Sequence, residues 1–188
     1  MRKGVYVWDC SIMAAWILAR TAPEARRALG AVRGKAREPS QGSPIQVDKP
    51  LARDFYKVVA AAPAAASRRA GWLRLPGPAD VEPGDVFAWL KPAMFKRRQN
   101  TGHVGFIASK PWRHPKQPSV WLVRIADATT ELHGDDSRPV GGEGGFGTAT
   151  IGFLIDASGA AIGYGWYGEA QDPLTYVPTQ IVFGRVLR

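Results

Sequence analysis

A single cysteine is the first residue of this sequence whose type and position could support catalysis. Cys10 is the only cysteine among the 188 residues, and it directly precedes an apolar run of helix formers, residues 11–20. A cysteine at the start of a helix has its sulfur near unpaired backbone N–H groups and the positive end of the helix dipole, which favours the thiolate. Cys10 is therefore a candidate nucleophile. The alternative is a small buried hydrophobic side chain, the commonest role of a free cysteine.

A histidine stands where it could act as the base for that thiol. His103 opens the β-type segment 101–107. Side chains alternate between the two faces of a strand, so His103 is predicted on the face of Gly105 and Ile107. The glycines beside it leave room for a substrate or for a helix terminus. Considered alone, His103 can also be read as a polar residue at a strand edge.

An aspartate could orient that histidine. Asp127 follows the next predicted strand, 120–126. If the two strands pair, its carboxylate can bind the second ring nitrogen of His103, hold the tautomer and favour a thiolate–imidazolium pair. Considered alone, Asp127 can be a turn residue. Together, the three residues predict a nucleophile, Cys10, a general base, His103, and an orienting group, Asp127.

The elements that must position these residues fall into two parts. Residues 11–20 predict a helix buried on most sides, residues 24–37 a second, basic helix, and residues 51–66 a third helix that Pro63 shortens. Short β-type runs between turn signals then predict strands at 85–90, 103–108, 120–126, 150–155, 161–166 and 180–187. Helices first and antiparallel strands afterwards predict an α+β fold. We expect one domain, 1–188, with a helical part at about 9–70 and a sheet part at about 72–188.

Four short motifs occur in an order that resembles the NlpC family of papain-like cysteine peptidases. They are Asp9-Cys10-Ser11 opening an apolar helix, Pro83-Gly84-Asp85-Val86 leading into a strand, Gly102-His103-Val104-Gly105, and a third polar residue on the next strand. The resemblance covers about residues 5–130. It implies a papain-like fold, with N-terminal helices packed on an antiparallel sheet or half-barrel. It also implies that Cys10, His103 and Asp127 are the catalytic residues, and that the backbone N–H of Cys10 helps to hold the oxyanion.

This sequence departs from the family pattern near the cysteine. Ile12 stands where the family usually has glycine, and Asp127 stands where the third residue is commonly histidine. Tyr6-Val7-Trp8 runs directly into Asp9, without the family's Tyr-x-Trp-Gly-Gly stretch. Beside the cysteine, Tyr6 and Trp8 are nevertheless predicted to contact substrate.

The positive charge lies in the first half of the chain. The net charge is +9, and residues 1–100 hold 18 Lys and Arg against 8 Asp and Glu, a net of +10. Such asymmetry favours an anionic polymer as partner, although a solvated basic face is an equal alternative. Arg97 and Arg98, just before His103, are predicted to contact an anionic substrate. Nucleic-acid-binding motifs are absent, so we expect no nucleic-acid partner.

Other features predict no cofactor, metal or membrane span. The segment from His133 to Asp136 is interpreted as a polar turn rather than a metal site, and Gly141 to Gly147 as a flexible loop rather than a phosphate loop. No apolar run approaches the roughly 18 residues of a membrane span. The start lacks a leader pattern, so the protein is either cytoplasmic or a mature or trimmed form that works at the cell envelope.

These observations predict a thiol-dependent amide hydrolase. The resemblance implies bacterial cell-wall peptides as its substrates, and an anionic wall polymer would suit the basic half of the chain. Two alternatives stay open. One is an acyltransferase or a lipid-active thiol hydrolase on the same fold, and the other is a catalytically inactive basic binding module.

Overall fold

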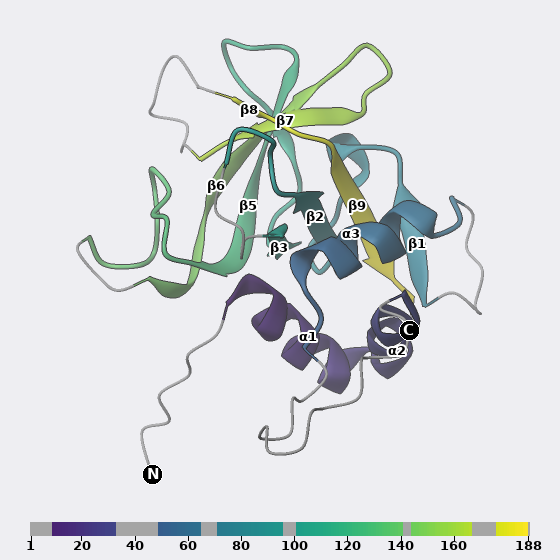
Figure 1. The fold of residues 1–188 in the computed structure, drawn as a ribbon. Coiled ribbons are helices and arrows are strands. Elements are labelled where there is room, and N and C mark those ends of the chain that lie inside the picture. The colour runs from purple at the N-terminus through teal and green to yellow at the C-terminus, as the bar shows by residue number, and fades with distance from the viewer. Residues whose placement is uncertain are drawn as a thin grey trace.

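The protein has an α+β fold, and in the described part of the chain three helices pack on one large antiparallel sheet (Figure 1). The computed structural model describes residues 9–32, 49–64, 71–95, 101–140, 144–166 and 176–187. Within these ranges the helices are α1 (Cys10–Thr21), α2 (Pro23–Val32) and α3 (Ala52–Ala61). The strands are β1 (Trp72–Leu75), β2 (Val86–Leu90), β3 (Gly102–Ile107), β4 (Trp112–Arg113), β5 (Val120–Thr129), β6 (Gly145–Ile155), β7 (Ala161–Gly165), β8 (Val177–Pro178) and β9 (Ile181–Val186). A short 3₁₀ turn, η1 (Pro78–Asp80), joins β1 to the segment before β2.

The strand order places the end of the chain inside the sheet. The order is β1-β9-β2-β3-β5-β6-β7-β8, with β4 paired to β5, and all the described pairings are antiparallel. In Figure 1, β9, drawn in yellow, lies between β1 and β2. The sheet curves enough for β7 to contact β9, which is not its neighbour in the strand order.

Apolar side chains fill both faces of the curved sheet. One core lies between the helices and the sheet and includes Leu18, Phe55, Trp72 and Val104. A second core lies on the other face and is rich in aromatic rings; it includes Phe87, Trp89, Ile125, Phe153 and Phe183. Alternation along each strand supplies both cores, because successive side chains point to opposite faces.

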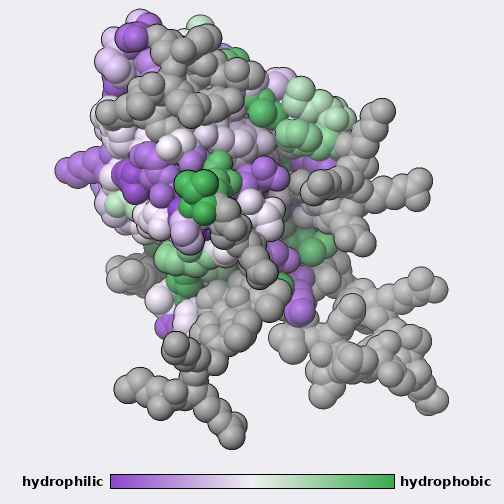
Figure 2. All heavy atoms as spheres, turned by 90° about the vertical axis from the view of Figure 1, so that its left-hand side faces the viewer, coloured by the Kyte–Doolittle hydropathy of each residue, from purple (hydrophilic) through white to green (hydrophobic). Residues whose placement is uncertain are grey.

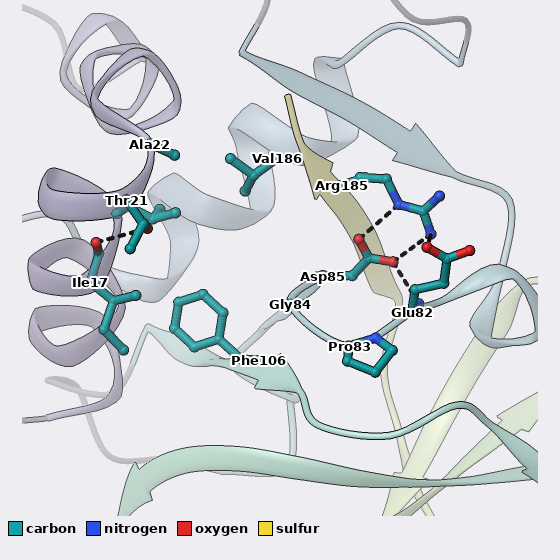
Figure 3. A pocket seen from close by; sticks show the side chains of 11 residues that line it. Ile17, Thr21, Ala22, Glu82, Pro83, Gly84, Asp85, Phe106, Arg185 and Val186 are labelled. Carbon is teal, nitrogen blue, oxygen red and sulfur yellow. Dashed lines mark hydrogen bonds and ion pairs between the residues drawn. The ribbon is translucent and has the colours of Figure 1, made fainter. Parts of the chain in front are cut away.

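The Pro83-Gly84-Asp85 step turns the chain into β2 and is held by charge. Asp85 Oδ2 accepts a hydrogen bond from the backbone N–H of Glu82 (2.7 Å), and Arg185 donates two hydrogen bonds of 2.9 Å to the same carboxylate. A cavity of about 320 Å³ separates this step from α1 (Figure 3). The charged groups on its wall, Glu82, Asp85 and Arg185, pair with one another.

Some local predictions need correction. Helix α1 is buried on one side only: Trp16 is 40% exposed and Ala19 is exposed. The guanidinium of Arg20 lies 3.7 Å above the Trp16 ring, which gives this surface ring a cation–π partner. The prediction that Pro63 shortens the third helix is confirmed, because α3 ends at Ala61. The second helix is described over Pro23–Val32, and residues 33–37 of its predicted range lie outside the described residues.

The prediction of a flexible loop from Gly141 to Gly147 is also wrong at its C-terminal end. Residues 145–147 begin β6 instead of forming a loop, and Asp127 lies inside β5 opposite Gly147 rather than after it. The reason is close packing: a Cβ on Gly147 would lie 2.6 Å from Nε of Arg138. Glycine is therefore a strand residue here because a guanidinium lies against it.

The described surface is mixed in polarity. On the face shown in Figure 2, hydrophobic side chains form small separate patches among hydrophilic ones. Within the described ranges, none of the helices has the length and apolar character needed to cross a membrane.

Candidate active site

The first turn of α1 places Cys10 next to the sheet. Asp9 is the N-cap of the helix, and its Oδ1 accepts hydrogen bonds of 2.8 Å from the Ile12 backbone N–H and from the Ser11 hydroxyl. Cys10 is the first residue of the helix and is half-buried. The Asp-Cys-Ser motif thus has a local explanation: Asp9 caps the helix that begins at the cysteine, and Ser11 donates a hydrogen bond to the capping carboxylate.

The start of β3 places His103 against aromatic rings. Gly102 has a φ of +130°, and a Cβ there would lie 1.9 Å from the carbonyl oxygen of Trp89. Only glycine fits so close an approach. The His103 ring then lies 5.1 Å from the Trp89 ring and 5.4 Å from the Trp166 ring, measured between centroids, and the residue is 9% exposed.

Strand pairing brings Asp127 to that histidine. Strands β3 and β5 pair with Phe106 opposite Ala126, so His103 and Asp127 share the other face of the sheet. Asp127 Oδ2 lies 2.8 Å from Nε2 of His103, and Asp127 is fully buried. The pairing on which the sequence argument depended is present, and the carboxylate contacts the ring.

Cys10 lies close enough to the same ring to interact with it electrostatically. Burial lowers the pKa of His103, but the negative charge of Cys10, with hydrogen bonds to Asp127 and Cys10, raises it more, to about 10 from 6.5. The structure therefore brings together Cys10, His103 and Asp127, in an arrangement suited to a thiolate–imidazolium pair.

A buried arginine holds the far side of the carboxylate. Nη2 of Arg138 donates a 3.2 Å hydrogen bond to Asp127 Oδ1, and its Nε donates a 2.7 Å bond to Asp136. Its Nη1 donates to the carbonyl oxygens of Thr129 (3.2 Å) and Gly145 (2.9 Å). Burial by itself raises the pKa of Asp127, but its two histidine neighbours have the larger, opposite effect and bring this pKa well below the usual range. Asp127 stays ionised as a result.

A second histidine reaches the same carboxylate. His133 is buried, stacks on Trp166 with a centroid distance of 4.3 Å, and has its Nε2 3.3 Å from Asp127 Oδ2. The contact is close but poorly aligned for a hydrogen bond. Nδ1 of the same ring lies 3.9 Å from Asp136 Oδ2. Two imidazoles and one guanidinium therefore surround one carboxylate.

Sequence reasoning missed both of these residues. The segment from His133 to Asp136 was interpreted as a polar turn, and Arg138 was given no role. The backbone N–H groups of His133 and Arg138 both donate to the Asp136 carboxylate, so the turn folds on Asp136 and directs both side chains to Asp127. A histidine and an arginine five residues apart around an aspartate were the available signal. In the part of the chain that is described, no three His, Cys, Asp or Glu side chains group as metal ligands.

The remaining predicted contacts cannot be placed. Tyr6 and Trp8 lie outside the described residues, as do Arg97 and Arg98. What the described residues do form beside His103 is a cavity of about 510 Å³, whose walls include Trp89, Tyr164 and Trp166.

Fold and site together define a class of protein: an α+β chain in which a cysteine at a helix start meets a histidine–aspartate pair carried by neighbouring strands. Comparison with models of protein families, with curated proteins and with solved structures finds no match.

Proposed function

We propose that this protein is a thiol-dependent amide hydrolase of the papain-like type, with Cys10 as nucleophile, His103 as general acid and base, and Asp127 as the orienting group. The observation that supports the proposal is a buried histidine that lies 2.8 Å from a buried carboxylate and interacts electrostatically with the cysteine. Structural cysteines do not need a base, and structural histidines do not need an oriented carboxylate.

The proposed reaction has two steps. The Cys10 thiolate attacks the amide carbonyl carbon, the carbon–nitrogen bond breaks, and His103 gives its proton to the leaving amine. Water then attacks the thioester, His103 takes a proton from that water, and the carbon–sulfur bond breaks to restore the thiolate. The backbone N–H of Cys10, in the first turn of α1, is the proposed donor to the oxyanion.

In the proposed reaction, the negative charge on Cys10 links the pKa of His103 to the progress of the two steps. The thiolate is the strongest influence that raises the pKa of His103. Acylation removes that charge, so the pKa of His103 falls when the leaving amine needs a proton. The ring is then neutral and able to accept a proton from water. The fixed charge of Asp127 keeps the ring oriented through both steps.

The proposed substrates are bacterial cell-wall peptides. Two sequence features support them: the order of the motifs around Cys10, Asp85 and His103, which resembles that of the NlpC family, and the net charge of +10 in residues 1–100. A basic surface raises the local concentration of an anionic wall polymer.

The test is a Cys10→Ala variant assayed on wall fragments and on a chromogenic acyl ester. We expect loss of at least about 10³-fold in kcat/KM, since the nucleophile is gone, with an unchanged circular dichroism spectrum. Ser11→Ala is the matched control: it keeps the thiol and should retain most activity. Retained hydrolysis in Cys10→Ala would refute the mechanism.

Thiol labelling separates this proposal from an inactive binding module. A Cys10 thiolate paired with His103 should react with iodoacetamide well below pH 8, whereas an unactivated thiol reacts mainly near and above its ordinary pKa of about 8.5. Labelling that rises only above pH 8 would favour the binding module.

A further inference from the structure

The cavity beside His103 is apolar and large. Its volume of about 510 Å³ lies in the range that encloses small ligands rather than one side chain. Its walls are mainly aromatic and aliphatic, and they include Trp89, Phe95, Tyr164 and Trp166. Trp89 and Tyr164 stack with centroids 4.2 Å apart, and the Trp166 ring meets the Tyr164 ring edge-on at 5.0 Å. These contacts fix the walls in place.

Exposed apolar side chains gather around the same cavity. Met94 is 60% exposed and Phe95 is 41% exposed, and both line it. Leu90, 40% exposed, lies at the end of β2, four residues before Met94. Large exposed hydrophobic groups that cluster at a cavity mark a site for an apolar ligand.

The two catalytic residues lie differently with respect to this cavity. His103 lines it and Cys10 does not. In the proposed reaction, the acyl group stays bonded to Cys10, while the leaving amine must lie within hydrogen-bonding reach of His103. The group that occupies a cavity walled by His103 is therefore the leaving amine.

We propose that this cavity binds an apolar substituent on the amine half of the substrate, so that the enzyme prefers amides of amines with an aliphatic or aromatic group. This inference rests on the proposed function and names a substrate class for the same site.

The reverse of the acylation step isolates this site. An amine bound in the cavity attacks the Cys10 thioester: its nitrogen bonds to the carbonyl carbon, the carbon–sulfur bond breaks, and the amine proton passes to His103. The products are a new amide and the free thiolate–imidazolium pair. Competition between amine and water then reports how well the cavity holds the amine.

The experiment forms the acetyl-enzyme from p-nitrophenyl acetate and adds ethylamine, butylamine, hexylamine or phenethylamine at equal free-amine concentration. The measured quantity is the ratio of amide to acetate produced. Across the aliphatic amines, we expect this ratio to rise up to about three- to fourfold for each added methylene until the cavity is filled. Phenethylamine should far exceed ethylamine.

A matched pair of variants locates the effect. Met94→Glu places a charge in the cavity lining and should flatten the dependence on chain length. Phe146→Glu makes the same kind of change at a side chain that is also 60% exposed but does not line the cavity. It should leave the dependence unchanged.

Each result is decisive. A ratio independent of amine size, with acetyl-Cys10 seen by mass spectrometry, overturns this inference and leaves the proposed function standing. A rate that depends on the length of the acyl group in a matched series of p-nitrophenyl esters, with no dependence on amine size, also overturns this inference and leaves the proposed function standing. Equal effects of the two variants likewise assign the preference elsewhere. If no acetyl-Cys10 forms, the proposed function fails and this inference fails with it.

Discussion

Among single residues, His103 has the most informative surroundings. Its ring is nearly buried, and burial alone would favour the neutral form. The charge of Cys10 and the hydrogen-bonded carboxylate of Asp127 reverse that preference and raise its pKa to about 10. At neutral pH, the ring is therefore expected to be an imidazolium. Two negative neighbours on one buried ring are hard to explain by packing, because an apolar residue would fill that space at lower cost.

The titration of His103 tests its contact with Cys10. In Cys10→Ala, the negative charge is lost, so the pKa of His103 should fall toward neutrality while Asp127 still supports the ring. NMR of the His103 ring protons across the pH range measures the midpoint. Cys10→Ser keeps a hydrogen-bonding group without the charge and should also show a lowered midpoint. A midpoint that is the same in all three proteins would mean that the thiol does not face the ring.

The carboxylate of Asp127 is expected to matter for catalysis. Asp127→Asn removes the charge that orients His103, and we expect kcat/KM to fall by about 10²- to 10⁴-fold, as for loss of the orienting carboxylate in other triads. Steady-state kinetics on an acyl ester provides the measurement.

Asp135→Asn is the matched control for that change. It also neutralises one aspartate, but Asp135 pairs with Arg124 and Thr150 and has a 38% exposed side chain. Its kcat/KM should stay within about twofold of the parent value. Similar losses in the two variants would assign no orienting role to Asp127.

Among the elements, strand β3 depends on the backbone conformation of its first residue, Gly102. Gly102 combines a left-handed φ with contact against Trp89, and His103 follows directly. A side chain at Gly102 would displace the strand start, and the imidazole with it. The glycine before the histidine is thus explained by backbone geometry rather than by flexibility.

Two alanine variants separate backbone strain from steric overlap. Gly84 also has a left-handed φ, +97°, but a Cβ there would meet nothing within 4 Å. We expect Gly84→Ala to lower the free energy of unfolding by about 1–2 kcal/mol. Gly102→Ala should cost at least about 1 kcal/mol more, because overlap adds to the strain. Urea denaturation followed by circular dichroism checks both, and equal losses would contradict the close contact with Trp89.

At the scale of the whole molecule, ion pairs connect distant parts of the chain. Arg185 on β9 binds Asp85 before β2, and these two residues are 100 positions apart in sequence. Arg138, from the turn between β5 and β6, links Asp127 to Asp136. Neutralising one partner of a buried ion pair destabilises the fold, because the other charge is left buried without a partner. Acid should therefore loosen the sheet.

The free energy of unfolding should fall at low pH, as the paired carboxylate of Asp136 becomes protonated. Burial raises the pKa of Asp136, but bonds from Arg138 and its backbone lower it more, to about 2 from 3.8. A carboxyl whose folded pKa is depressed stabilises the fold above its unfolded value and loses that contribution as the pH falls through the folded value. Urea denaturation at several pH values should show Asp136→Asn less stable than the parent at pH 7. That gap should narrow as the pH approaches 2, and a constant gap would contradict the ion pair.

Much of the site could be predicted because its parts are local. An aspartate before a helix caps it, so the position of Cys10 at the start of α1 follows from the residues around it. Alternation within 101–107 predicted the face of His103, and Asp127, after the predicted strand 120–126, was matched to it on the condition that the two strands pair. The structure shows that pairing. The strands predicted at 85–90 and 180–187 also formed, as β2 and β9, because apolar runs between turn signals have few alternatives.

Only the tertiary structure decided what surrounds that pair. Arg138 and His133 meet Asp127 because a turn folds on Asp136. Strand β9, at the end of the chain, pairs with β1 and β2. The aromatic cavity combines residues of β2, β3, β5 and β7. The sequence by itself thus determined the helix start, the strand faces and the catalytic trio as a hypothesis. It could not determine the neighbours, because contacts between distant segments depend on the sum of many weak packing terms rather than on any local pattern.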